Sequence, residues 1–379
     1  MPKQFLIMKI FGRELNEKNF LIEDVKRLLT NVNSPDERLN VLFSYVQKRM
    51  NWNKASDYYT DAGLVKAYKD QTGNVAEINF ILINMLRLAG LEANPVLIST
   101  TENGLPVYPT MTGFNYVIAA VQMTDKQVLL DATNKFTVPD ILPLNVLNWK
   151  GRLIKDDGTS LEIDLDPIKP SKENFNLMVK IEEDGKMTGQ VRIVKTDYDA
   201  YRFRIQNSGK TTESYVEAFE SQLGNLDITN YRIENLNSNF KNPIVETFSF
   251  TSNSQSDIIG EKLFINPLLF FTSTKNPFVS EQRQMSVYFG YKYQERYIIN
   301  LEIPAGYSVD AMPFPTKIVT EDRFVTYMLD YLQTENKIQI NCIKEINNSN
   351  FAADYYDGLK DIFQKIISSQ NEKIVLKKI

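Results

Sequence analysis

The chain has 379 residues, with 43 Lys and Arg against 47 Asp and Glu, which gives a net charge of -4. It contains one cysteine, Cys342, and no histidine. The chain therefore cannot build a nucleophile–imidazole pair or a His-ligated metal site. One cysteine cannot form an intramolecular disulfide or a multi-cysteine cluster. The mild charge, without a basic stripe, argues against nucleic-acid binding.

The length predicts two or three domains. Tyrosine and phenylalanine account for most of the aromatic rings (Tyr 19, Phe 22, Trp 2). These rings suit pleated surfaces, so the composition favours β-structure. No apolar run approaches the roughly 20 residues that a membrane-spanning helix needs, so no transmembrane segment is expected.

Residues from about 15 to 92 predict helices. Ser34-Pro35-Asp36-Glu37 has the pattern of a capped helix start, in which Ser is the N-cap and Glu its partner three residues later. Asn74-Val75-Ala76-Glu77 repeats this spacing, and Gly90 is the expected C-terminal residue of that second helix. A shorter helix between these two is expected to begin at Asp61.

The next part of the chain predicts strands and then a traverse. Three strands are expected, at about 95–99, 114–121 and 127–130, and a loop at 101–113 separates the first two. Residues 132–171 contain several prolines and have weak periodicity. We therefore interpret them as a traverse, that is, an irregular connecting segment, which leads to a linker.

After this linker the sequence becomes mostly β. The turn Asp184-Gly185 predicts a hairpin between about 176–183 and 187–196. Helices are expected near 197–223 and 351–367. Further strands are expected at about 228–236, 244–252, 285–303, 317–331, 336–343 and 373–376. The chain is thus divided into an N-terminal lead-in (1–34), a core (35–170) and a β-rich extension (171–379).

One helix start and two strands carry information about chemistry. They read Thr72-Gly73-Asn74-Val75-Ala76-Glu77, Phe114-Asn115-Tyr116-Val117-Ile118-Ala119 and Leu129-Leu130-Asp131-Ala132-Thr133. This order resembles the core of the transglutaminase-like superfamily, and more closely the members common in Bacteroidota, which carry a β-rich extension after the core. The resemblance covers residues 35–135 well and 172–379 more loosely. It implies an α+β fold, with a papain-like core followed by a sandwich-like, mostly β C-terminal region.

In that family the helix opens with a Gly-Asp/Asn-Cys motif, the middle strand carries His and the last strand carries Asp. Here the cysteine position is Val75, the histidine position is Tyr116, and only the acid, Asp131, is kept. Valine has no thiol proton to lose, and a phenol with a pKa of about 10 is a poor general base at neutral pH. Cys342 lies far along the chain beside Ile343 and is expected to be a buried, inert thiol.

Each of these positions also has a plainer interpretation. Val75 suits the first apolar residue of a buried helix face, and Tyr116 suits a strand residue packed beside the helix start. Asp131 suits a turn acceptor before Thr133. A sharper hypothesis is that the Tyr116 hydroxyl group hydrogen-bonds Asp131, in place of the imidazole–acid pair, and so satisfies a buried carboxylate.

The cysteine and histidine of the family motif are absent, while the helix start and the two strands around them are retained. This combination favours a catalytically inactive protein that binds a peptide, a glycan or an envelope protein, or acts as a scaffold. The side chains expected at the former substrate cleft are Trp52, Asn74, Asn115, Tyr116 and Asp131, and no metal or cofactor is expected. Two alternatives stay open. One is an active hydrolase that uses carboxylates alone. The other is a purely structural subunit with an exposed apolar patch.

Relatives in that family usually have a further β-domain before the core and an export signal. The start of this chain, Met1 to Phe11, is short and mixed in polarity and does not have the pattern of a signal peptide. We therefore expect a trimmed form or a shortened gene product. The resemblance suggests the periplasm or cell envelope, and a cytoplasmic location stays open.

Overall fold

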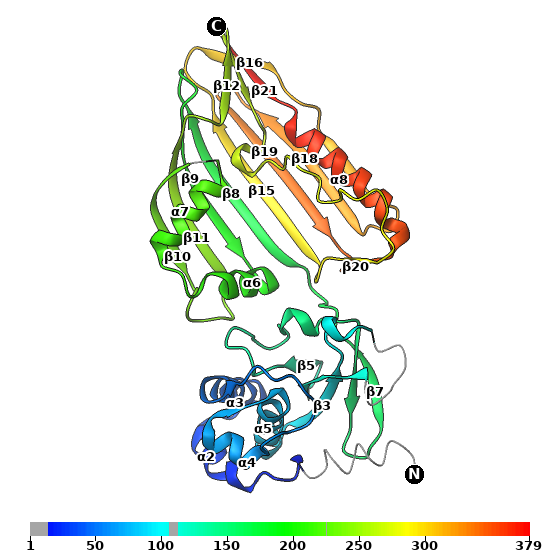
Figure 1. The fold of residues 1–379 in the computed structure, drawn as a ribbon. Helices are drawn as coiled ribbons and strands as arrows, with labels where there is room; N and C mark the ends of the chain where they lie inside the picture. Colours follow the sequence, from blue (N-terminus) through cyan, green and yellow to red (C-terminus); the bar gives the residue numbers. More distant parts are fainter. Residues whose placement is uncertain (1–13, 106–112, 225) are drawn as a thin grey trace. The chain divides into compact units, whose positions relative to one another are not determined.

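The computed structural model describes residues 14–105, 113–224 and 226–379 (Figure 1). The chain divides into two compact units, Met1–Pro167 and Ile168–Ile379. Helices and strands are both abundant, and strands dominate the second unit, so the expected α+β class is confirmed. The expectations for Met1 to Phe11 and for most of the loop 101–113 lie outside the described residues.

The helices of the first unit surround one central helix, α5. The first twelve of its fourteen residues, Val75 to Leu86, are buried. Such a helix is apolar on nearly all sides, as expected for an element enclosed by its neighbours. The described part of the lead-in packs here too, because Asn84 Nδ2 donates to the Glu14 carbonyl at 3.0 Å. The helices are α2 (Ile22–Leu28), α3 (Pro35–Arg49), α4 (Leu64–Asp70) and α5 (Val75–Leu88), with 3-10 turns at Asn19–Leu21, Thr101–Asn103 and Leu144–Val146.

A five-stranded antiparallel sheet forms the other half of this unit, with strand order β5-β4-β3-β6-β7. Helix α5 packs on β3 and β4. The bounds are β3 (Glu92–Ile98), β4 (Tyr116–Gln122), β5 (Gln127–Leu130), β6 (Lys150–Ile154) and β7 (Ser160–Asp164), and a small parallel pair is formed by β1 (Asn51–Trp52) and β2 (Thr72–Gly73).

Both capping boxes that the sequence predicts are present. In α3 the Ser34 side chain accepts from the Glu37 amide and Glu37 accepts from the Ser34 amide, and in α5 Asn74 and Glu77 do the same. The second box has additional hydrogen bonds. Glu77 Oε1 also accepts from three consecutive amides, those of Asp61 (3.1 Å), Ala62 (2.6 Å) and Gly63 (3.0 Å). Because Glu77 is 1% exposed, these amides stabilise its charge where water cannot.

Glycine at position 73 is required by this arrangement. A Cβ atom there would lie 2.9 Å from both Cβ and Oε2 of Glu77. The start of α5 therefore sits directly against the β2 backbone, and Trp52, which is paired with Gly73, lies beside it.

Two expectations for this unit are wrong. Helix α4 begins at Leu64 and not at Asp61, because Gly63 has φ 82° and ψ 155°, which is outside the helical region, and the amides of residues 61–63 bind Glu77. The stretch 132–171 is not only a traverse, since it contains β6 and β7. Its periodicity is weak because Gly151 fills a strand position where a Cβ would lie 2.6 Å from Val96 Cγ1, and Leu161 is exposed.

The second unit is built on an eight-stranded sheet of order β10-β11-β9-β8-β15-β19-β18-β17. Only the β8–β15 pair is parallel. The sheet strands are β8 (Ser171–Ile181), β9 (Met187–Lys195), β10 (Asp227–Glu234), β11 (Ile244–Ser252), β15 (Tyr293–Glu302), β17 (Thr316–Val319), β18 (Val325–Gln333) and β19 (Lys337–Ile346). The hairpin β8–β9 turns at Gly185, where φ is 78°, as the Asp-Gly signal predicts.

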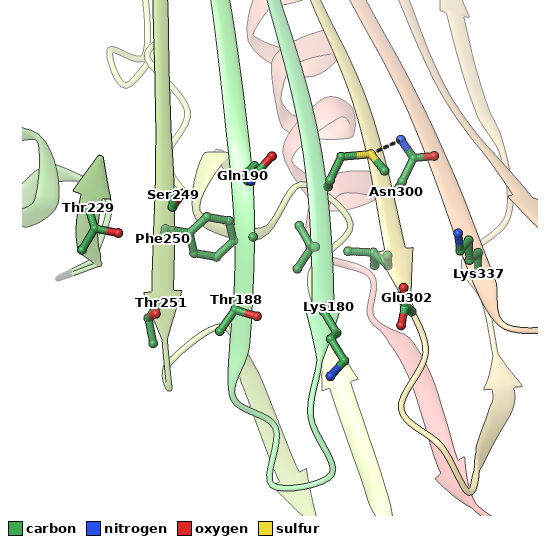
Figure 2. Close-up of a pocket in the computed structure, with 14 residues that line it drawn as sticks. Lys180, Thr188, Gln190, Thr229, Ser249, Phe250, Thr251, Asn300, Glu302 and Lys337 are labelled. Atoms are coloured by element: carbon green, nitrogen blue, oxygen red, sulfur yellow. Dashed lines mark hydrogen bonds between the residues drawn. The ribbon is translucent and has the colours of Figure 1, made fainter. Parts of the chain in front are cut away.

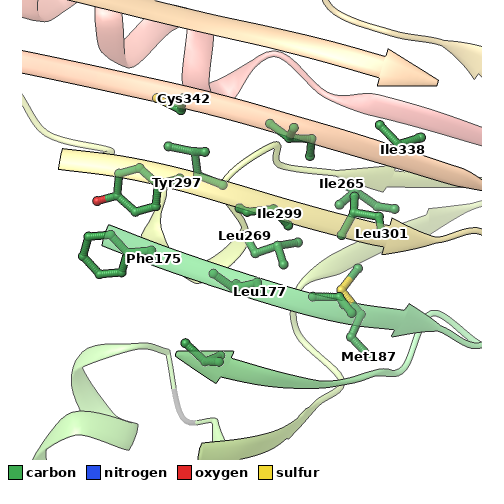
Figure 3. Close-up of a cluster of buried hydrophobic side chains, with 14 of the residues drawn as sticks. Phe175, Leu177, Met187, Ile265, Leu269, Tyr297, Ile299, Leu301, Ile338 and Cys342 are labelled. Carbon is green, nitrogen blue, oxygen red and sulfur yellow. The ribbon is translucent and has the colours of Figure 1, made fainter. Parts of the chain in front are cut away.

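One face of this sheet carries the core. Along β8, Phe175, Leu177 and Val179 are buried while Met178 and Lys180 are exposed, which is the period of two that a half-buried strand has. Figure 3 shows the apolar side chains of this face packed against those of Ile265 and Leu269. Full burial of such a side chain contributes about 1.5–3 kcal/mol.

A smaller sheet and three helices complete this unit, and α7, α8 and the small sheet contribute to its core. The small sheet has the order β12-β13-β21-β16, and α8 extends along the large sheet in Figure 1. These elements are α6 (Asp197–Asn207), α7 (Thr212–Gln222), α8 (Tyr356–Asn371), β12 (Ser256–Ile259), β13 (Lys262–Ile265), β16 (Tyr307–Ala311) and β21 (Ile374–Lys378), with a short pair β14 (Val287–Tyr288) and β20 (Asn350–Phe351) and 3-10 turns Leu269–Phe271 and Ala353–Tyr355.

Several boundaries differ from the expectation. The helical region 197–223 is two helices, because Thr211 caps a new one by accepting from the Ser214 amide. The last helix begins at Tyr356 rather than 351. The expected strands 285–303 and 317–331 are each interrupted, and β12 and β13 were not expected. Strand β11 has the predicted bounds.

We predict that Glu77→Ala destabilises the protein far more than Glu37→Ala. The first change removes the acceptor of four amides, one buried and three part-buried, and should cost about 3 kcal/mol of unfolding free energy. The second removes one exposed box partner and should cost about 0.5–1 kcal/mol. Urea unfolding of both variants measures the difference. Equal losses would show that the additional hydrogen bonds of Glu77 contribute nothing.

Candidate functional site

Three elements bring the predicted site residues to one place. Val75 is the first residue of α5, Tyr116 is the first residue of β4, and Asp131 directly follows β5. Strands β4 and β5 are hydrogen-bonded neighbours, and α5 packs on β4. The helix start and the two strand ends therefore converge, as the order of the motifs predicts.

The hydrogen bond proposed between Tyr116 and Asp131 is present. The Tyr116 hydroxyl lies 2.8 Å from Asp131 Oδ2 and 3.0 Å from Thr133 Oγ1. The other carboxyl oxygen, Oδ1, accepts from the Thr133 amide at 2.9 Å and the Thr133 hydroxyl at 2.7 Å. The carboxyl group is 0% exposed, and both of its oxygens have partners.

Asn79 is a site residue that the sequence reasoning missed. Its Nδ2 donates to the Val117 carbonyl at 2.9 Å and to Asp131 Oδ1 at 3.3 Å, while its Oδ1 accepts from the Ala132 amide at 3.0 Å. It follows Val75 by four residues, so the two share one face of the helix. This spacing, an amide one turn after the nucleophile position in an apolar helix, was the available signal.

The oxygen atoms of Tyr116, Thr133 and Asp131 form a closed ring of three contacts. The third side of the ring is the 2.7 Å contact between Thr133 Oγ1 and Asp131 Oδ1. The two hydroxyl groups supply two protons, which serve only two of these contacts when Asp131 is ionised. A protonated Asp131 supplies the third proton, and each of the three side chains can then donate once around the ring.

The electrostatic environment favours the same neutral form. Burial raises the pKa of Asp131, and the hydrogen bonds from Thr133, Tyr116 and Asn79 oppose this rise only in part. All of these donors are neutral groups. Unlike an imidazole, the phenol of Tyr116 cannot balance a carboxylate by becoming positive.

The expectation that five residues line an open cleft needs correction. Tyr116 is 1% exposed and Asp131 is 0% exposed. Asn74 is also buried, because it caps α5 and donates to the Tyr59 carbonyl. Only Trp52 and Asn115 are half-buried. The phenol and its partners fill this place, so a ligand can meet those two side chains but not the acid.

The cysteine does not belong to this site. Cys342 lies on β19 in the second unit and is 1% exposed. Burial raises the pKa of its thiol to about 12, so almost none is thiolate at neutral pH. The expectation of a buried thiol is confirmed.

A hollow of about 470 Å³ lies elsewhere, on the open face of the eight-stranded sheet (Figure 2). It is shallow and polar, and its one aromatic lining residue, Phe250, is buried behind Gly189. Lys180 at its edge already pairs with Glu182 at 2.8 Å. These features are typical of the solvated face of an antiparallel sheet. Its lining residues are Met178, Val179, Lys180, Thr188, Gly189, Gln190, Thr229, Ser249, Phe250, Thr251, Asn300, Leu301, Glu302 and Lys337.

Comparison with known proteins gives a family model that matches part of the chain, and similar solved structures. Residues 261–376 match the family described as "Domain of Unknown Function with solved-structure structure (DUF3858)". A crystal structure from Parabacteroides distasonis, described as a "putative protease", is similar with a TM-score of 0.58 and 11% sequence identity, over 100% of this chain. This chain spans 59% of that one. No curated protein matches the chain. The likeness in structure shows a shared fold.

Two searches of the described residues found nothing. In the described ranges, no group of three or more Asp, Glu or Cys side chains is arranged to hold a metal ion. Among the helices formed by these residues, none is both long and apolar enough to cross a membrane.

We predict that Asp131→Asn is tolerated where Asp131→Ala is not. Asparagine presents one acceptor and one donor, as a protonated aspartic acid does, whereas alanine leaves the Thr133, Tyr116 and Asn79 groups unpaired at a cost of about 3 kcal/mol. The native pKa of Asp131 is raised, so its contribution to stability is full below the ordinary value of 3.8 and is lost as the pH rises through the native pKa.

Unfolding free energies of the three proteins between pH 4 and 8 provide the measurement. The wild type should lose stability relative to Asp131→Asn as the pH rises. If the asparagine variant is as unstable as the alanine variant at every pH, the ionised form is the one that the fold requires, and the neutral ring is wrong.

Proposed function

We propose that this chain is a catalytically inactive member of the transglutaminase-like superfamily, acting as a binding or scaffold module for a peptide, a glycan or an envelope protein. The observation that supports this is the ring of Tyr116, Thr133 and Asp131, which is buried where the resemblance calls for an accessible imidazole–acid pair. An imidazole must reach substrate to move its proton, and this phenol does not reach the surface.

The nucleophile position supports the same conclusion. Val75 offers no electron pair, and it is 0% exposed at a helix start that would otherwise favour a thiolate. The raised pKa of Cys342 and its burial in β19 remove the only thiol of the chain from consideration. Loss of a member of such a triad lowers turnover by several orders of magnitude.

The binding role rests on what has been kept. The capped helix, both strands and the fully hydrogen-bonded carboxyl group form an ordered scaffold beside which a partner can bind. A partner would contact the surface beside the start of α5, where Trp52 is half-buried and Lys54 lies 4.8 Å from its ring centroid. The periplasm or cell envelope is the proposed location, on the resemblance alone.

If the protein is catalytically inactive, it should show no amide hydrolysis or acyl transfer on glutaminyl peptides. The wild type, Cys342→Ala and Asp131→Asn should all match the buffer rate, because no accessible nucleophile–base pair exists. A rate above buffer that falls in Asp131→Asn would contradict the proposal at this site. A rate that both variants keep would place an active site elsewhere in the chain.

If a partner binds at the proposed contact surface, the fluorescence of Trp52 should change and that of Trp149 should not. The chain has only two, Trp52 and Trp149, so Trp149→Phe and Trp52→Phe each leave a single reporter. Titration with a glutaminyl peptide should shift the emission of Trp149→Phe and leave that of Trp52→Phe unchanged. A response from Trp149 alone would move the contact surface away from α5, and no response would exclude this peptide as partner.

A further inference from the structure

A row of charged side chains crosses the core face of the large sheet. Lys195 of β9 is paired with Glu173 of β8, Glu173 with Glu295 of β15, and Glu295 with Lys344 of β19. Four adjacent strands therefore present the charges plus, minus, minus, plus in one line. Two glutamates lie directly beside each other in this row, an arrangement that is destabilising unless cations flank it.

The flanking cations are in contact with this pair. Lys195 forms an ion pair with Glu173, and Lys344 Nζ lies 2.8 Å from Glu295 Oε2. The four side chains are only 11–24% exposed. Lys195 also lies 3.5 Å from Glu246 of β11, which is fully buried and accepts from the hydroxyl groups of two tyrosines. Glu246 therefore adds another negative charge to the row.

Helix α6 covers this row and brings one more acid to it. Asp199 is 6% exposed and accepts from the Tyr291 hydroxyl at 2.7 Å and from Arg202 at 3.2 Å. The helix is seated by aromatic contacts as well. The Tyr198 and Tyr291 rings stack with centroids 5.1 Å apart, and Lys195 lies 5.4 Å from the Phe203 ring centroid.

The row and the residues in contact with it contain one more acid than cations. The acids are Glu173, Glu246, Glu295 and Asp199, and the cations are Lys195, Lys344 and Arg202. Among the seven charged residues that the structure describes in this row, four carboxylates face three cations, so negative charge is in excess by one in a poorly hydrated place, and a single proton removes the excess. Asp199 is the acid that takes this proton most easily, because its cation, Arg202, is 51% exposed and is therefore screened by water.

We propose that Asp199 is protonated when α6 is seated on the sheet, and that its ionisation loosens this helix, so that α6 is a pH-responsive element of the second unit. Ionised, Asp199 would add a third negative charge beside Glu173 and Glu295 under the helix. The Tyr291 hydroxyl and Arg202 would still hold the carboxylate, but they do not offset the added repulsion and desolvation.

The titration behaviour of the group agrees with this geometry. Burial, with the neighbouring Glu173 and Glu295 charges, raises the pKa of Asp199 to about 6, against the opposing effects of Tyr291 and Arg202. Because the native pKa is the higher one, the contribution to stability is full below 3.8 and is lost between that value and about 6. The helix is therefore seated more firmly at pH 5 than at pH 7.5.

Hydrogen exchange of the α6 amides, corrected for the intrinsic rate at each pH, tests this proposal. In the full wild-type chain we expect protection of residues 197–207 to fall by about tenfold from pH 5 to pH 7.5. About one pH unit of this range lies below the native pKa of Asp199, and each such unit changes the linked opening equilibrium by a factor of about ten. Asp199→Asn keeps an acceptor for Tyr291 without the charge, so its protection should not change with pH. Asp197→Asn is the matched control on the same helix, because Asp197 is exposed, and it should behave as the wild type.

Carbon-13 carboxyl shifts of Asp199 provide a second measurement that does not depend on the variants' folding. A titration midpoint near 6 supports the proposal. A midpoint at or below 4 would overturn it, as would an equal fall in protection in Asp199→Asn and the wild type.

Discussion

The first unit depends on a carboxyl group that has no access to water and no cation as partner. Asp131 survives in the interior because four neutral donor groups, from Thr133, Tyr116 and Asn79, surround it. These donors come from a helix, a strand and the turn after a second strand, so satisfying one acid fixes three elements relative to one another. Loss of any donor would leave a buried polar group unpaired, which costs more than the hydrogen bond gains.

Each unit holds a buried acid, but the physical cause differs. Around Asp131 burial raises the pKa, and the groups that oppose this rise are neutral hydrogen-bond donors. Around Asp199 other carboxylates add to burial, and a cation opposes them. The first arrangement locks a structure, since every partner is neutral and short-range. The second responds to pH, since one proton decides whether the row of charges under α6 is balanced.

Much of the fold could be read from local chemistry. The capping boxes at Ser34 and Asn74 were available from residue type and spacing, and the contact between Tyr116 and Asp131 was suggested by the resemblance of the three motifs. For Asn79 the spacing of one turn after Val75 was the only signal, because an amide within an apolar helix shows its partner only when β4 and β5 are placed beside it. Strand β6 was missed because Gly151 breaks its pattern for a reason of tertiary packing. Helix α4 starts later than expected because the segment before it, which ends at the non-helical Gly63, is bound by the distant Glu77.

The central claim is that the place where Val75, Tyr116 and Asp131 converge is sealed rather than open. Cysteine labelling tests it most directly, with Val75→Cys compared against the exposed Ser56→Cys, both in a Cys342→Ser background. The two substitutions conserve size, and a sealed site should react with a maleimide at least about a hundredfold more slowly, limited by local opening. Equal labelling rates in the folded protein would show that position 75 faces an open cleft and would contradict the account.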